Sequence, residues 1–391
     1  MSYDDPMNTK PSGPPQSIAI IGAGIIGLSA AWAFVQRGVR VTVYDPGPEE
    51  RAASWAAAGM LAPAFEAGFE PDAHPDLFKI CAASAALWPD YARELQSVTN
   101  IALGVSFGRT LAVAKDAEKV QPLRALLSAL DQRGQAHERL SGDGLSVQEP
   151  ALSPDMALGA WLASDGQVDN RAVMQALREA VVASGLATFI AQEAPLVWRA
   201  GGLRVAGHDD VLIAAGWKSA GISVQFEAVS GRLDAIEPCL EALLPIGGQM
   251  LSVVPTQGQT PEATLRQGSL YIVPKADRVI IGATVEPGEA LTRPTTEAIE
   301  ALKAAAAGLC PGLANARVIE TWAGVRPGLP DHAPMIGRGP ETGAWFVTGH
   351  YRNGILLAPL TARWIVDAMM GEACDPLMAA FAPARFAAAT A

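Results

Sequence analysis

The sequence IAIIGAGIIGLSAAWAFVQRGVRVTVYD, residues 18–45, decides the fold of this chain. Its first residues, Ile18–Ile21, predict a buried parallel strand, and the apolar helical pattern that follows runs to Gln36, with Gly38 as its stop. A second predicted strand, Arg40–Tyr44, leads directly to Asp45. This order of strand, glycine turn, helix, strand and acid is typical of a dinucleotide-binding unit.

Each glycine of the turn has a physical use. Gly22 permits a tight turn, Gly24 lets the backbone approach a pyrophosphate, and Gly27 lets the helix pack close to the strand. The free N–H groups at the start of the helix favour phosphate, and Asp45 lies about 20 residues further on, where a carboxylate can accept hydrogen bonds from a ribose.

Two other interpretations of this stretch are a generic glycine-rich turn and a transmembrane span, because residues 17–36 contain no charged residue. The glycines at its start and the charged strand directly after it argue against a span, as does the lack of a basic flank before it.

Composition narrows the class of protein. A chain of 391 residues suits two closely built domains, and with 50% hydrophobic and 18% charged residues it is globular. A net charge of −11 and a pI near 5.0 argue against nucleic acid or an anionic membrane surface as the main partner.

Cysteines and histidines are scattered, with no C-x-x-C pair and no H-x-x-x-H spacing. This pattern predicts unpaired thiols in a reducing cytoplasm and no metal site. Residues 1–15 are polar and proline-rich without an apolar secretory segment, and residues 1–16 are predicted to be a disordered tail.

The rest of the chain predicts an α/β fold with two insertions, at about residues 104–154 and 230–320. Helices are predicted over Asp76–Leu95, Ala117–Leu130, Asn170–Ala183 (with an N-cap before it), Thr295–Gly308 and Gly354–Met370. Strand character is predicted over Val105–Ala114, Phe189–Trp198, Val211–Gly216, Gln249–Pro255, Leu270–Pro274, Val279–Thr284 and Trp345–Thr348.

Four further stretches are candidates for chemistry. The segment RAASWAAAGMLAP, residues 51–63, has little side-chain bulk, so it is either a small-residue core helix or the lining of a flat ligand. Arg326 precedes a proline and is expected in an extended segment, where it would bind either a substrate carboxylate or a structural Asp or Glu.

In TGHYRNGILLAP, residues 348–359, a strand runs through His350 and Arg352 into a helix start that can stabilise negative charge. Tyr271 is either a carboxylate ligand or a core residue.

Five motifs occur in order along the chain: AAAGMLAP, YIVPK, IIGATVEPG, WAGVRPGLPDHAPMIGR and TGHYRNGILLAP. Together they resemble the glycine oxidase family, the thiamine-pathway branch of the D-amino-acid oxidase superfamily, over nearly all of Ile18–Met370. The resemblance implies a non-covalent FAD and a Rossmann-like, glutathione-reductase-like FAD-binding domain, expected over residues 17–103, 155–229 and 321–385. It also implies an inserted α+β, mainly antiparallel substrate domain, expected over residues 104–154 and 230–320.

The same resemblance implies a reaction. Glycine, a small D-amino acid or an amine would be oxidised by hydride transfer from Cα to flavin N5, the imine would hydrolyse to the oxo acid and ammonia, and O2 would be reduced to H2O2, in thiazole biosynthesis. A homo-oligomer is expected from the resemblance alone. The alternatives are a D-amino-acid dehydrogenase that reduces a quinone, a catalytically silent flavin-binding protein, and a nicotinamide dehydrogenase.

The resemblance also assigns residues. Arg326 would clamp the substrate carboxylate, Tyr271 would share it, and Arg352 would support the substrate side of the flavin. The residues expected to bind the cofactor are Gly22, Gly24, Ile25, Ile26, Gly27, Tyr44, Asp45, Ser54, Ala58, Gly59, Met60, Leu196, Gly349, His350, Tyr351, Arg352, Asn353, Gly354, Ile355 and Leu356.

The chain departs from the family pattern at several positions. Asp45 stands where Glu is common, and Ser269 and Val285 stand where a His and a Met can occur, which predicts a roomier pocket. One residue is inserted near Trp55, and residues 350–359 contain no Cys that could hold a flavin covalently.

Overall fold

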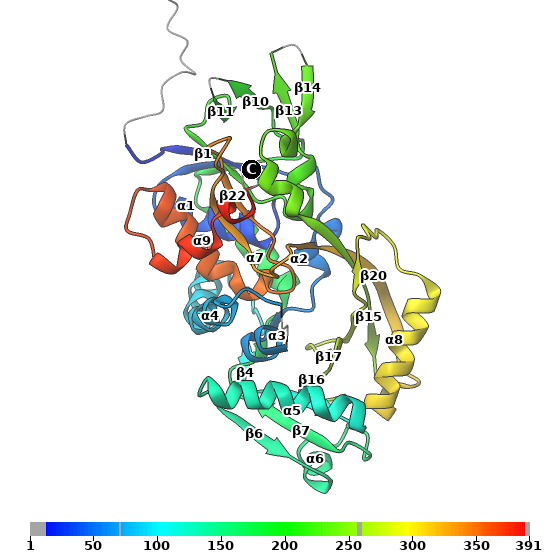
Figure 1. Cartoon of the computed structure of the whole chain (residues 1–391). Helices are drawn as coiled ribbons and strands as arrows, with labels where there is room; N and C mark the ends of the chain where they lie inside the picture. The colour runs from blue at the N-terminus through cyan, green and yellow to red at the C-terminus, as the bar shows by residue number, and fades with distance from the viewer. Residues whose placement is uncertain (1–12, 70–71, 200, 228, 256–259, 388–391) are drawn as a thin grey trace, which may run out of the picture.

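The computed structural model describes residues 13–69, 72–199, 201–227, 229–255 and 260–387. Of the tail predicted to be disordered, residues 1–12 lie outside the described residues. Figure 1 shows two regions joined by long strands: an upper region with the N-terminal strand and the C-terminal helix, and a lower region that carries α5, α6 and α8.

The upper region is built on a mainly parallel sheet. Apolar side chains on both faces of its central strands favour a covered, parallel arrangement. Strand β1 pairs in parallel with β2 on one side and with β12 on the other, so the predicted return of the strand near residue 211 to the first sheet is confirmed. In order across the sheet the strands are β21 (Met335–Arg338), β22 (Trp345–Thr348), β12 (Asp210–Ile213), β1 (Ser17–Ile21), β2 (Arg40–Tyr44) and β9 (Ala187–Ile190).

Alternate residues of β1 serve the two faces of this sheet, as a strand period of two requires. Ile18 and Ile20 pack with the helices, whereas Ala19 and Ile21 pack with a small second sheet. The helices on the first face are α1 (Ile25–Gln36), α4 (Leu77–Thr99), α7 (Asn170–Ala183) and α9 (Gly354–Met369); the second sheet contains β11 (Gly202–Val205), β10 (Leu196–Arg199), β13 (Ser223–Phe226) and β14 (Val229–Arg232).

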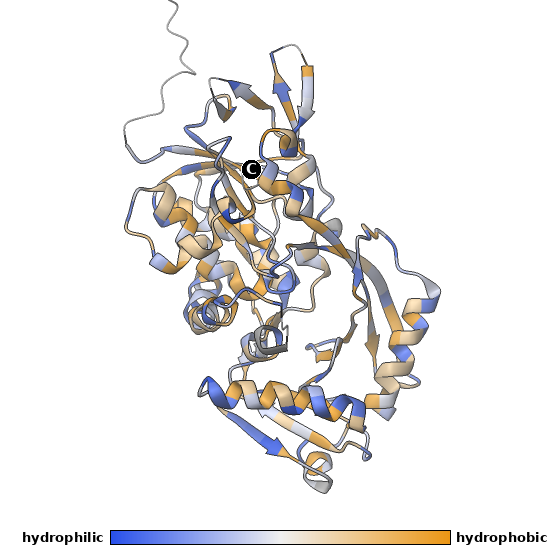
Figure 2. Cartoon of the chain, viewed as in Figure 1, coloured by the Kyte–Doolittle hydropathy of each residue, from blue (hydrophilic) through white to orange (hydrophobic). Residues whose placement is uncertain are grey.

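The lower region is a mainly antiparallel sheet, with one parallel pair between β16 and β5. Its strands are β19 (Glu286–Pro287), β15 (Leu244–Val254), β18 (Val279–Gly282), β17 (Leu270–Pro274), β16 (Thr264–Gln267), β5 (Thr110–Ala114), β7 (Leu158–Leu162) and β6 (His137–Leu140), with β20 (Arg317–Gly328) paired to β15. Helices α5 (Ala117–Gln132), α6 (Asp143–Gln148) and α8 (Thr296–Leu309) pack on it, and Figure 2 shows α5 alternating between hydrophobic and hydrophilic residues, as an amphipathic helix does.

Short elements connect the two regions. They are the helices α2 (Ala53–Ala56) and α3 (Pro63–Phe69), the 3-10 helix η2 (Gly216–Gly221), and a small sheet of β3 (Met60–Leu61), β8 (Gly166–Gln167) and β4 (Ser106–Phe107). The long antiparallel pair of β15 and β20 runs between the regions, with Ile246 opposite Arg326 and Met250 opposite Trp322 (Figure 1).

Most predicted elements are confirmed within a few residues. The helix over Asn170–Ala183 begins as expected, because the Asp169 carboxylate accepts hydrogen bonds from the backbone N–H groups of Arg171 and Ala172. The transmembrane interpretation, which the sequence already argued against, is excluded, since residues 17–36 contain β1, the glycine turn and the 12-residue helix α1. No helix among the described residues has the length and hydropathy to cross a bilayer.

Two strand predictions need correction. The run Phe189–Trp198 is not one strand: β9 ends at Ile190 in the first sheet, and β10 begins at Leu196 in the second. Pro195 has no N–H to donate to a ladder, which suits the crossing between layers. The run Val105–Ala114 is likewise divided into β4 and β5, because Gly108 takes a φ of 73° between them.

Candidate functional site

A cavity of about 900 Å³ extends from the carboxyl ends of β1 and β2 to the face of the antiparallel sheet. This size lies at the upper end of the range for small-molecule and cofactor sites. Asp45 and the glycine turn line one end, and Tyr271 and Arg326 line the other. The two ends lie more than two hundred residues apart in the sequence, and the fold joins them in one site.

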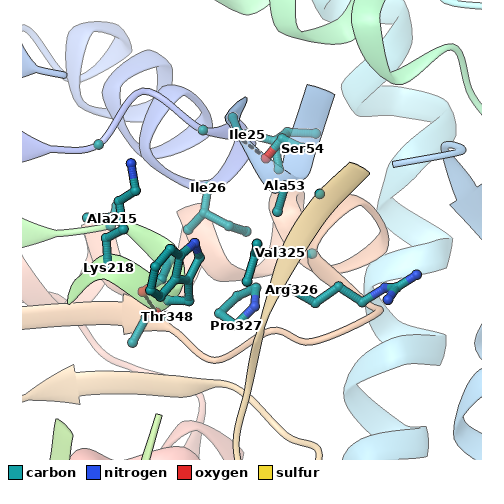
Figure 3. Close-up of a pocket in the computed structure, with 18 of the residues that line it drawn as sticks. Ile25, Ile26, Ala53, Ser54, Ala215, Lys218, Val325, Arg326, Pro327 and Thr348 are labelled. Atoms are coloured by element: carbon teal, nitrogen blue, oxygen red, sulfur yellow. Dashed lines mark hydrogen bonds between the residues drawn. The ribbon is translucent and has the colours of Figure 1, made fainter. Parts of the chain in front are cut away.

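The glycine turn has the geometry that its sequence predicts. Gly22 has a φ of 110°, and a Cβ at this position would lie 2.5 Å from the carbonyl oxygen of Ala214. A Cβ at Gly27 would lie 2.0 Å from the oxygen of Gly22, so helix and turn can be this close only without a side chain. At the start of α1 the Ile25 N–H donates to Ser54 Oγ at 2.9 Å, a bond drawn in Figure 3.

Asp45 holds the turn together. One carboxylate oxygen accepts from the Ala23 N–H at 2.7 Å, and the other accepts from the Gly47 N–H at 2.8 Å. Each carboxylate oxygen has a second lone pair, so these bonds leave acceptor capacity at the cavity wall. The position fits the ribose role expected of Asp45, which stays a prediction.

The segment of small residues after Trp55 lines the cavity. Ala56, Ala57, Ala58, Gly59 and Met60 all contribute to the wall, and Ala53 and Ser54 lie beside Ile25 in Figure 3. The core interpretation holds for the short helix α2, since Ala56 and also Ala58 belong to a small buried cluster with Tyr271 and Trp322. That the segment lines a flat ligand stays a prediction.

Arg326 lies near the end of β20, in the extended conformation expected before Pro327. Its Nη1 donates to the carbonyl oxygens of Gly247 at 3.0 Å and Thr284 at 3.3 Å. In the part of the chain that the structure describes, no carboxylate lies within ion-pair distance of this guanidinium, so the structural ion pair left open for it is not seen. Figure 3 shows its side chain extending away from Val325 and Pro327. A cation without an acidic partner is suited to an anionic ligand.

Tyr271 is buried beside this arginine. Its hydroxyl donates to Met250 Sδ at 2.7 Å, and burial raises the pKa of the phenol despite the opposing charge of Arg326. The phenol is therefore neutral at physiological pH. The core interpretation of Tyr271 is confirmed, because the residue is buried. It also lines the cavity, where its role as a carboxylate ligand stays a prediction.

Arg352 is tied to an acid that the sequence reading missed. Its Nε lies 2.8 Å from Glu66 Oε2, and the same carboxylate accepts from Arg266 Nη2 at 2.6 Å. Burial alone would raise the pKa of Glu66, but the charges of Arg352, Arg266 and Arg326 hold it below the usual value. A single acid among apolar residues in PAFEAGF was the available signal, because buried acids require cationic partners.

Arg266 is fully buried and was also missed. Its guanidinium lies 3.9 Å over the Phe65 ring, and Nη1 donates to Met60 Sδ at 2.8 Å. Asp165 completes the surroundings by accepting from the Ala64 and Phe65 N–H groups, and burial raises the pKa of this carboxyl to about 7.

The remaining predicted residues divide between the wall and its support. Ile26, Tyr44, His350, Tyr351, Gly354 and Ile355 line the cavity, whereas Gly27, Leu196, Gly349, Asn353 and Leu356 are not among its lining residues. Leu196 is buried in the core between the two upper sheets. Wall residues without a predicted role include Trp217, Lys218, Met250 and Ala283.

His350 is buried and forms a hydrogen bond with Thr361 Oγ1 at 3.1 Å. Burial lowers the pKa of its imidazole to about 3. Below about pH 6.5 the unfolded chain binds a proton at His350 and the folded chain does not, so this residue makes the folded state less stable as pH falls toward 5.

Replacing His350 by Gln should remove this dependence. We expect the difference in unfolding free energy between the chain and His350→Gln to shrink by about 1–2 kcal/mol from pH 7.5 to pH 5.5, as denaturant titrations at both values would measure. A constant difference across this range would contradict a neutral, buried His350.

No group of three or more His, Cys, Asp and Glu among the described residues could hold a metal ion. All four cysteines lie in the described chain and are free, with Cys81, Cys239 and Cys310 buried and Cys374 exposed.

Comparisons with known proteins agree with this geometry. Residues 17–368 match the model of the DAO family, described as FAD dependent oxidoreductase. The chain is 32% identical to the bifunctional protein ThiO/ThiG of Synechocystis sp. over 95% of its own length, and it spans only 54% of that relative. It is 30% identical to the glycine oxidase of Pseudomonas aeruginosa, covering 94% of this chain and 99% of that enzyme.

Solved structures point the same way. The crystal structure of glycine oxidase from Geobacillus kaustophilus superposes with a TM-score of 0.83 at 28% identity, covering 97% of this chain and all of the other. The expected α/β fold with an inserted, mainly antiparallel part is thereby confirmed, as is the resemblance to the glycine oxidase branch. The cavity that starts at the glycine turn fits the cofactor of this family, and the chain belongs to the DAO family of FAD-dependent oxidoreductases.

Proposed function

We propose that the chain oxidises glycine or another small amino acid or amine at the Arg326 end of the cavity. For glycine the balanced reaction is glycine + O2 + H2O → glyoxylate + NH3 + H2O2. The observation that carries the proposal is the Arg326 guanidinium, which lies beside the buried Tyr271 and has no carboxylate partner among the described residues.

The chain's own residues would orient the substrate. Arg326 would bind its carboxylate, with Tyr271 as a second contact, and Arg352 would add positive charge at the same end. FAD, when bound, supplies the two-electron acceptor and returns the electrons to O2. Met250, Ala283 and Val285 would contribute an apolar part of the wall beside the substrate.

The cofactor would be held without a covalent bond. Gly22, Gly24 and the start of α1 would face the pyrophosphate, Asp45 a ribose, and residues 350–355 the ring. None of the four cysteines is a lining residue of the cavity, which supports a non-covalent flavin.

A place in thiamine biosynthesis is part of the proposal. It is supported by the bifunctional relatives named ThiO/ThiG, of which this chain spans about half. The expected cytoplasmic location is favoured by the four free cysteines, and the expected homo-oligomer is tested by light scattering of the purified chain.

The decisive experiment mixes purified, FAD-loaded protein with glycine, small D-amino acids and N-substituted glycines, first without oxygen and then with it. We expect flavin bleaching with at least one substrate and formation of one H2O2 for each substrate oxidised. Bleaching without peroxide would indicate a dehydrogenase that reduces a quinone, and no bleaching with any member of the panel would indicate a silent flavin protein. A visible flavin absorption spectrum of the purified protein would exclude a nicotinamide as its cofactor. Release of FAD from the acid-denatured protein would exclude a covalent flavin.

The same panel tests the predicted width of the pocket. Both Ser269 and Val285 line the cavity. Because both are smaller than the His and Met that can occur there, we expect oxidation of substrates with one or two carbons more than glycine.

A further inference from the structure

A cluster around Arg171 joins three segments that are distant in sequence. The guanidinium carbon of Arg171, in the first turn of α7, lies 3.5 Å from the ring centroid of Trp55 and 5.0 Å from that of Trp322. Its two terminal nitrogens bind the Glu320 carboxylate on β20 at 3.0 and 3.2 Å. A planar guanidinium is suited to this combination, because it can stack on an indole while it binds a carboxylate with two nitrogens.

The cluster holds the backbone of the segment that forms the cavity wall. Asn170 Nδ2, next to Arg171, donates to the carbonyl oxygens of Ser54 at 2.8 Å and Trp55 at 3.1 Å. Trp322 Nε1 donates to the carbonyl oxygen of Ala56 at 2.9 Å. Three consecutive carbonyl groups of α2 are thus bound from outside the cavity.

The other side of this segment faces the cavity. Ser54 Oγ accepts the Ile25 N–H at the start of α1, and Ala53, Ser54 and Ala56 are lining residues. Arg171 itself does not line the cavity, and its partner Glu320 lies on the strand that carries Arg326. The cluster therefore connects the wall at the cofactor end with the strand of the substrate end.

We propose that Arg171 is a positioning residue for the cofactor: by stacking on Trp55 and binding Glu320, it holds residues 53–56 against the start of α1. This role concerns cofactor affinity, so it does not depend on which amine the chain oxidises.

The test is Arg171→Met, which keeps an unbranched apolar side chain and removes the charge and the planar fork. Apoprotein of the full chain is titrated with FAD and followed by flavin fluorescence. We expect the dissociation constant of FAD to rise about tenfold, since stacking and the two-nitrogen ion pair are both lost. With FAD at saturation, we expect the visible circular dichroism of the flavin to change while kcat/KM for the best substrate stays within about threefold, because Arg326 and Tyr271 are untouched.

Arg385→Met is the matched control. Arg385 also binds an acid with two nitrogens, Asp331 at 2.9 and 3.3 Å, and its guanidinium lies 4.3 Å over Phe386. The side chains of Arg385 and Arg171 are 16% and 24% exposed, and neither Arg385 nor Asp331 lines the cavity. We expect this variant to lower thermal stability without changing FAD affinity.

Two more variants separate positioning from general stability. Arg171→Lys keeps the charge but not the planar stack, and its FAD affinity should fall between those of the chain and Arg171→Met. Glu320→Gln keeps the stack and weakens the ion pair, so it should weaken FAD binding two- to fivefold. If Arg171→Met does not fold, this variant tests the positioning role in its place. Equal FAD affinities in Arg171→Met and Arg385→Met, or an unchanged affinity in Glu320→Gln when Arg171→Met is unfolded, would overturn the proposal.

Discussion

Arg326→Ala should lower kcat/KM for glycine, or for the best carboxylate substrate, by about 30-fold to several thousand-fold. This range corresponds to the roughly 2–5 kcal/mol lost when one partner of a buried, hydrogen-bonded charge pair is removed. The effect is large because the guanidinium is held in place by the Gly247 and Thr284 carbonyl groups and has no carboxylate partner within the described chain. Steady-state oxygen consumption measures it.

Two comparisons make this result specific. For a small amine that lacks a carboxylate, kcat/KM should fall far less in Arg326→Ala, because Arg326 has no carboxylate to bind in that substrate. For a carboxylate substrate, kcat/KM of Arg326→Lys should lie between the values of the unchanged chain and Arg326→Ala, since an ammonium keeps the charge without the planar fork. As a control, Arg338→Ala removes an exposed arginine whose Nε donates to the Gly343 carbonyl, and it should leave kcat/KM unchanged. Normal turnover of glycine by Arg326→Ala would refute the clamp.

Glu66→Gln should cost roughly 3–5 kcal/mol of unfolding free energy, the usual effect of breaking a buried ion pair from one side. One carboxylate binds two guanidinium groups here, at 2.6 Å for Arg266 and 2.8 Å for Arg352, and the Arg266 side chain has no exposed surface. A neutral amide would remove the carboxylate charge that the two guanidinium groups share. Urea denaturation of the FAD-saturated chain and variant at pH 7 gives the difference.

The pH dependence of this difference is a second check. The folded chain holds the pKa of Glu66 below its usual value, so its carboxylate stabilises the fold above the unfolded pKa of about 4.3 and loses that contribution as pH falls through the folded pKa. The chain and Glu66→Gln should therefore converge in stability below pH 4.

Glu262→Gln is the matched control for the same substitution. Glu262 binds Arg109 at 2.9 Å, but both side chains are more than half exposed, so the change should cost less than about 1 kcal/mol. If Glu66→Gln costs no more than this control, Glu66 does not balance the two arginines.

Local patterns in the sequence predicted much of the fold, for a physical reason. The glycine turn, the helix from Ile25 to Gln36 and the cap at Asp169 depend on hydrogen bonds and steric limits between residues near each other in the chain. Such features can be inferred from spacing alone. Local patterns singled out Arg326, Tyr271 and Arg352, the resemblance gave them roles, and the structure brings them to one end of one cavity.

What the sequence left undecided depends on groups that meet only after folding. Glu66 binds Arg266 and Arg352, which lie 200 and 286 residues further along, and no spacing rule connects them. The same is true of Arg171, which reaches Glu320 across 149 residues, and of the division of residues 189–198 between two sheets. The sequence by itself determined the dinucleotide turn and the order of elements, because those are local. Only the tertiary structure decided which charges neutralise one another and which arginine stays available for an anion, because burial and pairing are set by the packing of the whole chain.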